Sequence, residues 1–368
     1  MGDDHALPES KALGEPMERK NYETLNAMRG VAAVSVVLYH AVNLLHIQIF
    51  PRGYLAVDLF FVLSGFVIAH AYDNRIAGGL GWREFAKIRI IRFYPLYLAG
   101  ILLGTVRELA LILTHNHYAF TTVQLGIALV TALLFLPFPI KERGYNLFSM
   151  NIPSWSLMYE LLVNVAYALL FHKLSNRVLA IVITLAGGAL VALVFRFGSA
   201  NLGALSTDAI GGIARTIFSF SAGLLIYRWN IRIRHVPATL LLLVLVACFM
   251  APVFFGYYYD LLFIIILSPA LVIAGTSTEP SPAALKTFIY LGVISFPIYA
   301  VHRPLLELAA AAATLAHLPG PVVGAACIIG LLILCPLLDR WYDRPFRGIL
   351  SNATRTKLRS DPSRTAAP

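Results

Sequence analysis

The sequence has few charged residues. Asp, Glu, Lys and Arg make up 13% of its 368 residues, about half of the roughly 25% usual in soluble domains. Hydrophobic residues make up 58%, and the mean hydropathy is +0.74. This scarcity of charge excludes a large soluble domain and places most of the chain in lipid. At about 20 residues per crossing, the length allows roughly ten spans joined by short loops.

Cysteine is scarce as well. Cys248, Cys327 and Cys335 lie in apolar stretches, without the paired spacing of a disulfide framework or the ligand spacing of a zinc site. We therefore expect no metal site and packing roles for all three. Residues 1–20 lack an apolar core with a small-residue cleavage site, so we expect no cleaved signal peptide and a first span that acts as its own insertion signal.

The net charge of +10 comes from basic residues that cluster in short loops and tails beside apolar helices. This distribution indicates cytoplasmic loops of a membrane protein, and we expect no nucleic-acid partner.

Apolar windows predict helices along most of the chain. The eleven windows are 25–45, 55–72, 95–114, 121–137, 154–172, 178–195, 210–228, 238–255, 259–276, 287–303 and 320–339. If all eleven crossed, two basic clusters would face outward, against the positive-inside bias. Counting 95–137 as one crossing, with one piece re-entrant or packed against other helices, returns both clusters to the cytoplasm. Lys141 and Arg143 then remain on the outer side of the membrane, against the positive-inside bias.

The predicted fold is therefore an all-α, polytopic transmembrane helical bundle of about ten spanning helices, with both termini cytoplasmic. One membrane domain covers residues 25–347. A polar N-terminal tail at 1–24 precedes it, and a polar basic tail at 348–368 follows it.

The first window holds two strongly polar side chains, Arg29 and His40, in LNAMRGVAAVSVVLYHAV. Eleven helical residues come within about 20° of three whole turns, so both side chains share one face, roughly 16 Å apart along the axis. We expect them to face one cavity, with His40 as the functional group, because a buried histidine in a span is costly. Arg29 alone also fits a side chain that snorkels to the inner interface.

Two carboxylates follow inside apolar runs. Asp58 begins VDLFFVLSGFVIAH and needs a partner or water, for which His40 or Arg29 is the obvious choice; a helix N-cap is the alternative. Glu160 shares one helical face with Ser156 in PSWSLMYELLVNVAYAL, and that stripe is expected to face the bundle. A structural pairing of Glu160 with Arg215 is equally consistent.

A basic run, FAKIRIIRFYPLYL, approaches the cytoplasmic face. Arg89 and Arg92 lie three residues apart on a helix and can grip one anionic group, a geometry suited to phosphate. Alone, such a run is more typical of a topogenic anchor. In ISFPIYAVHRPLLE, Tyr299 and His302 share a face, and His302 fits either a site or the outer interface.

Taken together, these segments resemble the acyltransferase family 3 of bacterial membrane proteins. The likeness rests on RGVAAVSVVLYH, DLFFVLSGFVI, RIIRFYPLYL, SWSLMYEL and SFPIYAVHRPL, in matching order over residues 25–347. One departure is Asn26, where an aspartate or similar polar residue is expected. The chain is similar to the stand-alone form of the family, without an appended hydrolase-like domain.

The resemblance implies an O-acyltransferase of the bacterial cytoplasmic membrane. The acyl group, usually acetyl, would move from cytoplasmic acyl-CoA to a cell-surface or secreted glycan or a lipid-linked saccharide, with no tightly bound cofactor. Arg89, Arg92 and Arg29 would hold the CoA phosphates. His40 would act as general base or take the acyl group, with Asp58 or Glu160 setting its tautomer.

The resemblance also implies an acceptor side. Trp155, Ser156, Tyr299, His302 and Arg215 are its expected substrate-binding residues. Two other classes of protein remain open. A secondary transporter also places Arg, His, Asp and Glu inside the membrane, and a non-catalytic scaffold would need no His40 at all.

Overall fold

The computed structural model describes residues 21–231, 233 and 236–359, with the backbone alone for 353–359. Its main helices are α1 (Glu23–His40), α2 (Val42–Leu45), α3 (Ala56–Ala77), α4 (Trp82–Leu113), α5 (Thr122–Leu133), α6 (Ser154–Leu170), α7 (Asn176–Phe197), α8 (Ala209–Trp229), α9 (Ala238–Phe249), α10 (Gly256–Leu262), α11 (Ser268–Thr276), α12 (Leu285–Leu315), α13 (Gly320–Leu338) and α14 (Arg344–Arg359). The described residues contain no strand, only an isolated bridge between Asn146 and Leu205. The tail predicted at 1–24 lies almost wholly outside the described residues.

Within the described residues, eight helical stretches are long and apolar enough to cross a membrane, and the all-α polytopic bundle is confirmed. They are Gly53–Ala77, Trp82–Leu113, Ser154–Lys173, Asn176–Phe197, Ala209–Trp229, Val253–Thr276, Leu285–Leu315 and Gly320–Asn352. Two further apolar helices, α5 and α9, are shorter, and the central helix α1 has 18 residues. The 12 residues of α5 extend only about 18 Å against roughly 30 Å of hydrocarbon, so α4 supplies the one crossing expected within 95–137.

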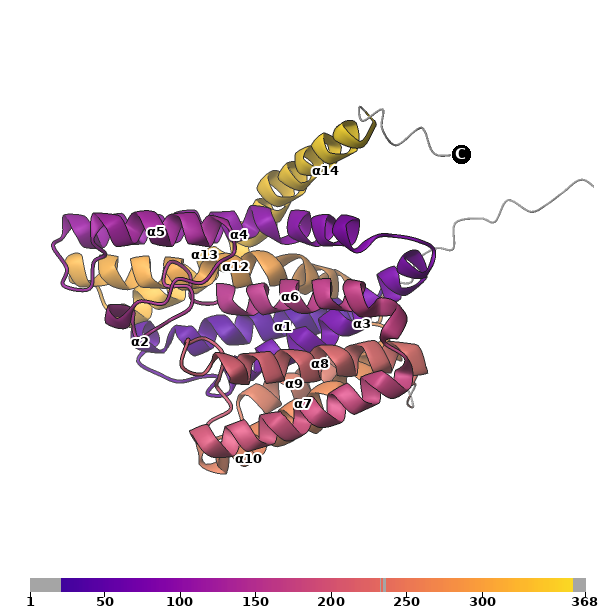
Figure 1. Cartoon of the computed structure of the whole chain (residues 1–368). Helices are drawn as coiled ribbons and strands as arrows, with labels where there is room; N and C mark the ends of the chain where they lie inside the picture. The colour runs from indigo at the N-terminus through magenta and orange to yellow at the C-terminus, as the bar shows by residue number, and fades with distance from the viewer. Residues whose placement is uncertain (1–20, 232, 234–235, 360–368) are drawn as a thin grey trace, which may run out of the picture.

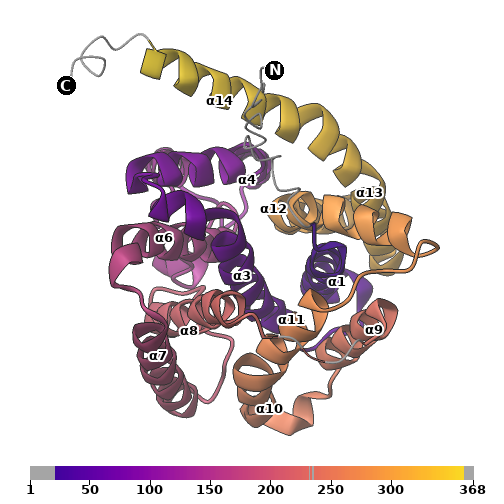
Figure 2. The same ribbon diagram turned by 90° about the vertical axis from the view of Figure 1, so that its right-hand side faces the viewer.

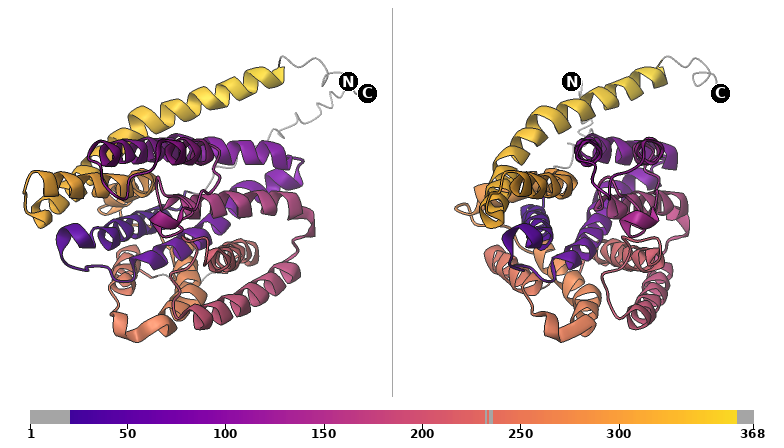
Figure 3. Two further views of the ribbon diagram at one scale, coloured as in Figure 1. Left: turned by 60° about the vertical axis from the view of Figure 1, so that its left-hand side comes forward. Right: turned by 90° about the vertical axis from the view of Figure 1, so that its left-hand side faces the viewer.

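Several predicted boundaries differ from the structure, and the helix predicted at 287–303 continues to Leu315. The helix predicted to start at 95 starts at Trp82, so the basic run of Arg89 and Arg92 is itself helical. The window 238–255 forms a helix of only 12 residues. The tail predicted at 348–368 continues as α14 to Arg359, with 360–368 outside the described residues; this helix leaves the bundle at an angle (Figures 1 and 3).

Seen end-on, α1 and α3 lie at the centre of the bundle, with the other spans arranged around them (Figure 2). The most extensive helix contacts join α1 to α12 and α3 to α8. Since α1 carries Arg29 and His40, this central position places both side chains among helices and away from the lipid-facing perimeter.

The α3–α8 contact depends on two glycines. A Cβ at Gly65 would lie 2.1 Å from the carbonyl oxygen of Phe220, and one at Gly223 would lie 2.1 Å from the carbonyl oxygen of Val62. Gly65 and Gly223 therefore permit the close packing of α3 against α8.

We expect Gly65→Ala to force α3 and α8 apart and to lower stability by about 1–3 kcal/mol. Thermal unfolding of the purified protein measures this effect. Gly188→Ala on α7 is the matched control, because no atom lies within 4 Å of its added Cβ. Equal melting temperatures for the two variants would contradict the close-contact explanation.

Candidate active site

A chamber inside the bundle gathers most of the cationic side chains predicted for the site. We call it the arginine chamber; its volume is about 140 Å³. Its polar lining comprises Arg29, Ser64, Arg89, Arg92, Ser156, Glu160, Ser295 and Tyr299. The structure thus brings six of the predicted site residues together from α1, α4, α6 and α12.

The carboxylate of this chamber is Glu160. Its Oε1 accepts a hydrogen bond of 2.6 Å from Ser64 Oγ and lies 3.5 Å from Nη2 of Arg89. Among the described residues Arg29 forms no ion pair within 4 Å, although it lines the same chamber. The alternative that paired Glu160 with Arg215 is wrong, because Arg215 has another partner. The chamber therefore presents cations that its one carboxylate does not neutralise.

A groove continues from this chamber between α1, α4, α12 and the start of α14. It shares Arg29 and Arg92 with the chamber, and Asp343 and Arg347 also line it. Arg92 Nη1 lies 3.5 Å from Asp343, whereas Arg347 Nη2 lies 2.9 Å from the same carboxylate. Arg92 is therefore the more loosely held of the two guanidinium groups.

A second chamber contains His40, and we call it the histidine chamber; its volume is about 360 Å³. Trp155, Tyr299 and Arg303 also line it. The expectation that Arg29 and His40 face one cavity is wrong in detail. They share a face of α1, but their separation along the axis places them in two chambers.

The two chambers adjoin at Tyr299 and Val57, which line both. The Tyr299 hydroxyl shares a hydrogen bond of 2.5 Å with Ser156 Oγ. Both hydroxyls also approach the carbonyl oxygen of Pro153, at 3.3 Å for Tyr299 and 3.0 Å for Ser156. This hydroxyl pair therefore lies where a molecule would pass from one chamber to the other.

His40 has different neighbours from those expected. Nη1 of Arg303 donates to His40 Nδ1 over 3.2 Å, and the ring of His302 stacks on His40 with centroids 5.4 Å apart. His302 is fully buried and its Nδ1 donates to the carbonyl oxygens of Tyr299 (2.9 Å) and Ile298 (3.1 Å). His302 is therefore neither an interfacial residue nor part of the lining of either chamber.

Asp58 pairs with Arg215 and not with His40 or Arg29. Arg215 donates from Nε to Oδ1 over 3.0 Å and from Nη2 to Oδ2 over 2.6 Å, and both side chains are fully buried. Nη1 of Arg215 donates to the carbonyl oxygen of Leu202 over 2.6 Å, and the guanidinium lies 5.8 Å from the Trp155 ring. Neither charge lines a chamber, so the roles predicted for Asp58 at His40 and for Arg215 at the substrate give way to a structural ion pair.

Arg303 was not among the residues predicted for the site. The prediction paired Tyr299 with His302, although Arg303 lies only about 40° around the helix from Tyr299, closer than the roughly 60° that separate His302 from it. The sequence nonetheless contains a feature that could have identified this residue. Arg303 and Glu307 lie four residues apart within an apolar helix, and charged residues inside a membrane span mark a functional site by default.

Sequence comparisons relate this chain to known proteins. A family model described as an acyltransferase domain matches residues 22–340. Over 165 residues the chain is 39% identical to "Protein 2 in picA locus" of Rhizobium radiobacter, a match that covers 42% of this chain and 83% of that protein. Over 168 residues it is 27% identical to acyltransferase MdmB of Streptomyces mycarofaciens, covering 42% of this chain and 40% of that protein. No solved structure matches the chain significantly.

Proposed function

This chain belongs to the acyltransferase family whose domain model matches residues 22–340, and on that premise we propose that it transfers a short acyl group from acyl-CoA to a glycan hydroxyl. The acceptor would be a cell-surface or secreted glycan or a lipid-linked saccharide, and the acyl group an acetyl group. The proposal places this multi-pass protein in the bacterial cytoplasmic membrane with both termini cytoplasmic. Acyl-CoA would then enter from the cytoplasm.

The observation that carries the proposal is the succession of groove, arginine chamber and histidine chamber. Arg29 and Arg92 line the first two spaces, and Tyr299 lines the last two. A donor with an anionic end and a long thioester arm matches this order, since the arginines would hold phosphates while the arm reaches toward His40. Trp155 in the histidine chamber supplies a flat face for a sugar ring.

In the proposed reaction, His40 accepts the proton of the acceptor hydroxyl. The hydroxyl oxygen forms an ester bond with the thioester carbon, the carbon–sulfur bond breaks, and the proton passes from His40 to the departing sulfur. Ser156 or Tyr299, by releasing the carbonyl oxygen of Pro153, would donate a hydrogen bond to the thioester oxygen at the junction of the two chambers. A transporter would move its substrate without breaking a bond, and family membership favours the enzyme.

Incubating membranes that contain the protein with acyl-labelled acetyl-CoA tests the proposal. We expect label in the glycan fraction together with release of free CoA thiol, and neither in membranes that lack the protein. Uptake of a solute without thiol release would instead identify a transporter.

We expect Arg92→Gln to raise the KM for acetyl-CoA about tenfold, because a charged contact to phosphate is lost. The KM for S-acetyl-pantetheine, which has no phosphate, should be the same in wild type and variant. Arg83→Gln is the matched control, since Arg83 lies on the same helix at an exposed position. An equal rise for both substrates would contradict phosphate binding by Arg92.

A further inference from the structure

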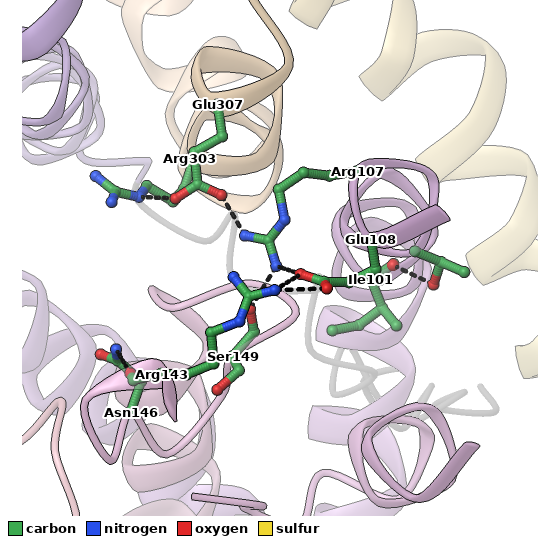
Figure 4. Close-up of polar contacts among 9 residues, drawn as sticks. Ile101, Arg107, Glu108, Arg143, Asn146, Ser149, Arg303 and Glu307 are labelled. Atoms are coloured by element: carbon green, nitrogen blue, oxygen red, sulfur yellow. Dashed lines mark hydrogen bonds and ion pairs between the residues drawn. The ribbon is translucent and has the colours of Figure 1, made fainter. Parts of the chain in front are cut away.

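Arg303 is one end of a chain of alternating charges that joins α12, α4 and the connection before α6 (Figure 4). Nε of Arg303 donates to Glu307 over 2.7 Å, and Glu307 also pairs with Arg107. Arg107 pairs in turn with Glu108, which accepts two hydrogen bonds of 2.8 and 2.6 Å from Arg143. Each carboxylate therefore lies between two guanidinium groups.

This series of ion pairs holds Nε of Arg303 in place and leaves Nη1 able to move away from His40. Glu108 is fully buried, and Arg107 also donates to the carbonyl oxygen of Ser149 over 2.8 Å, so the inner part of the chain is held tightly. The side chain of Arg303 is 25% exposed and lines the histidine chamber. Its Nη1 can therefore leave His40 while Nε stays on Glu307.

The contact with Arg303 determines which nitrogen of His40 can accept a proton. A guanidinium only donates, so His40 Nδ1 is the accepting nitrogen and the proton of the neutral ring is on Nε2. Tyr39, whose ring lies 5.0 Å from that of His40, and His302 are the other titratable neighbours of the ring. His302 offers no substitute base to the chamber, because it is fully buried and does not line it.

We propose that Arg303 guards His40: it occupies Nδ1 until the acceptor hydroxyl, which donates to the same lone pair, replaces it. The inference rests on the proposed function of His40 as the proton acceptor. The acceptor hydroxyl and the guanidinium compete for the lone pair of His40 Nδ1, so His40 can accept a proton only when an acceptor has displaced Arg303. The alternative nucleophile is water, which would give a free carboxylic acid and CoA. A water molecule lacks the further contacts by which a bound glycan is held against the chamber wall, so it displaces the guanidinium less readily and hydrolysis is suppressed.

Arg303 is then a positioning residue, and its loss should change the rate of thiol release in the absence of an acceptor. Arg303→Met removes every donor but leaves Glu307 paired with Arg107, so the ion chain keeps its other members. With purified full-length protein and acetyl-CoA, but no glycan, we expect thiol release about tenfold faster than in wild type. Arg303→Lys, which keeps a cationic donor, should stay near the wild-type rate.

Two further variants make the result specific. Arg228→Met is the matched control, because Arg228 donates to Asp73 over 2.8 Å far from His40, and Asp73 keeps Tyr167 as a partner. This control should leave acceptor-free thiol release unchanged. Adding His40→Ala to Arg303→Met should abolish the increase in acceptor-free thiol release, because the imidazole that acts as the base is then missing.

The outcomes separate this inference from the proposed function. Unchanged or slower acceptor-free thiol release in a folded Arg303→Met protein that still transfers acyl groups would overturn the guard alone. A rise that survives in the double variant would also overturn it, since the base would not be His40. Equal glycan acylation by wild type and His40→Ala would overturn the function of His40 and the guard together.

Discussion

Replacing His40 by alanine is expected to slow acyl transfer by a factor of about 10²–10⁴, the usual contribution of a positioned general base. Insertion and folding should not change, because His40 ends α1 and lies only partly buried at the histidine chamber. Transfer of label from acetyl-CoA to glycan, measured on equal amounts of protein, gives the effect. Thermal unfolding of the same samples shows whether the fold is intact.

A matched histidine elsewhere provides the control for this substitution. His117 lies exposed in the connection between α4 and α5, so His117→Ala should transfer at the wild-type rate. Substantial transfer by a folded His40→Ala protein would remove His40 from the chemistry, and with it the assignment of the histidine chamber to the acceptor.

The sequence predicts the local features of this protein well. Hydrophobic windows identify the helices, and the spacing of Arg29 and His40 correctly places both on one face of α1. The arginine chamber also contains Arg89, Arg92 and Glu160, as the polar positions suggest. These predictions succeed because they depend on helical periodicity, which is a property of each segment by itself.

The pairing of buried charges could not be predicted in the same way. Whether Asp58 meets His40 or Arg215 depends on which helices pack against α3, and Arg215 is 157 positions away along the chain. The sequence pointed to His40 or Arg29 as the partner of Asp58, and to Arg215 only as a partner of Glu160. Only the close α3–α8 contact, which two glycines permit, places Arg215 against Asp58.

The misfit in the predicted topology has a similar explanation. Arg143, which the charge rule left on the wrong side, donates twice to the buried Glu108. A paired charge of this kind satisfies a structural need and carries little information on orientation. Counting basic residues by loop cannot distinguish such a charge from a free one, so the segment around Arg143 was the weakest part of the sequence-based topology.

The Asp58–Arg215 pair leads to the largest expected effect on stability. Asp58→Ala would leave the Arg215 guanidinium fully buried without its counterion, and breaking a buried pair in this way costs about 3–5 kcal/mol. Thermal unfolding of the purified protein should show this loss. Asp58→Ala combined with Arg215→Met should recover much of it, because no unpaired charge remains, and the folded double variant should still transfer acyl groups. An Asp58→Ala protein of normal stability that cannot transfer would instead place this carboxylate in the chemistry, as the partner that orients His40.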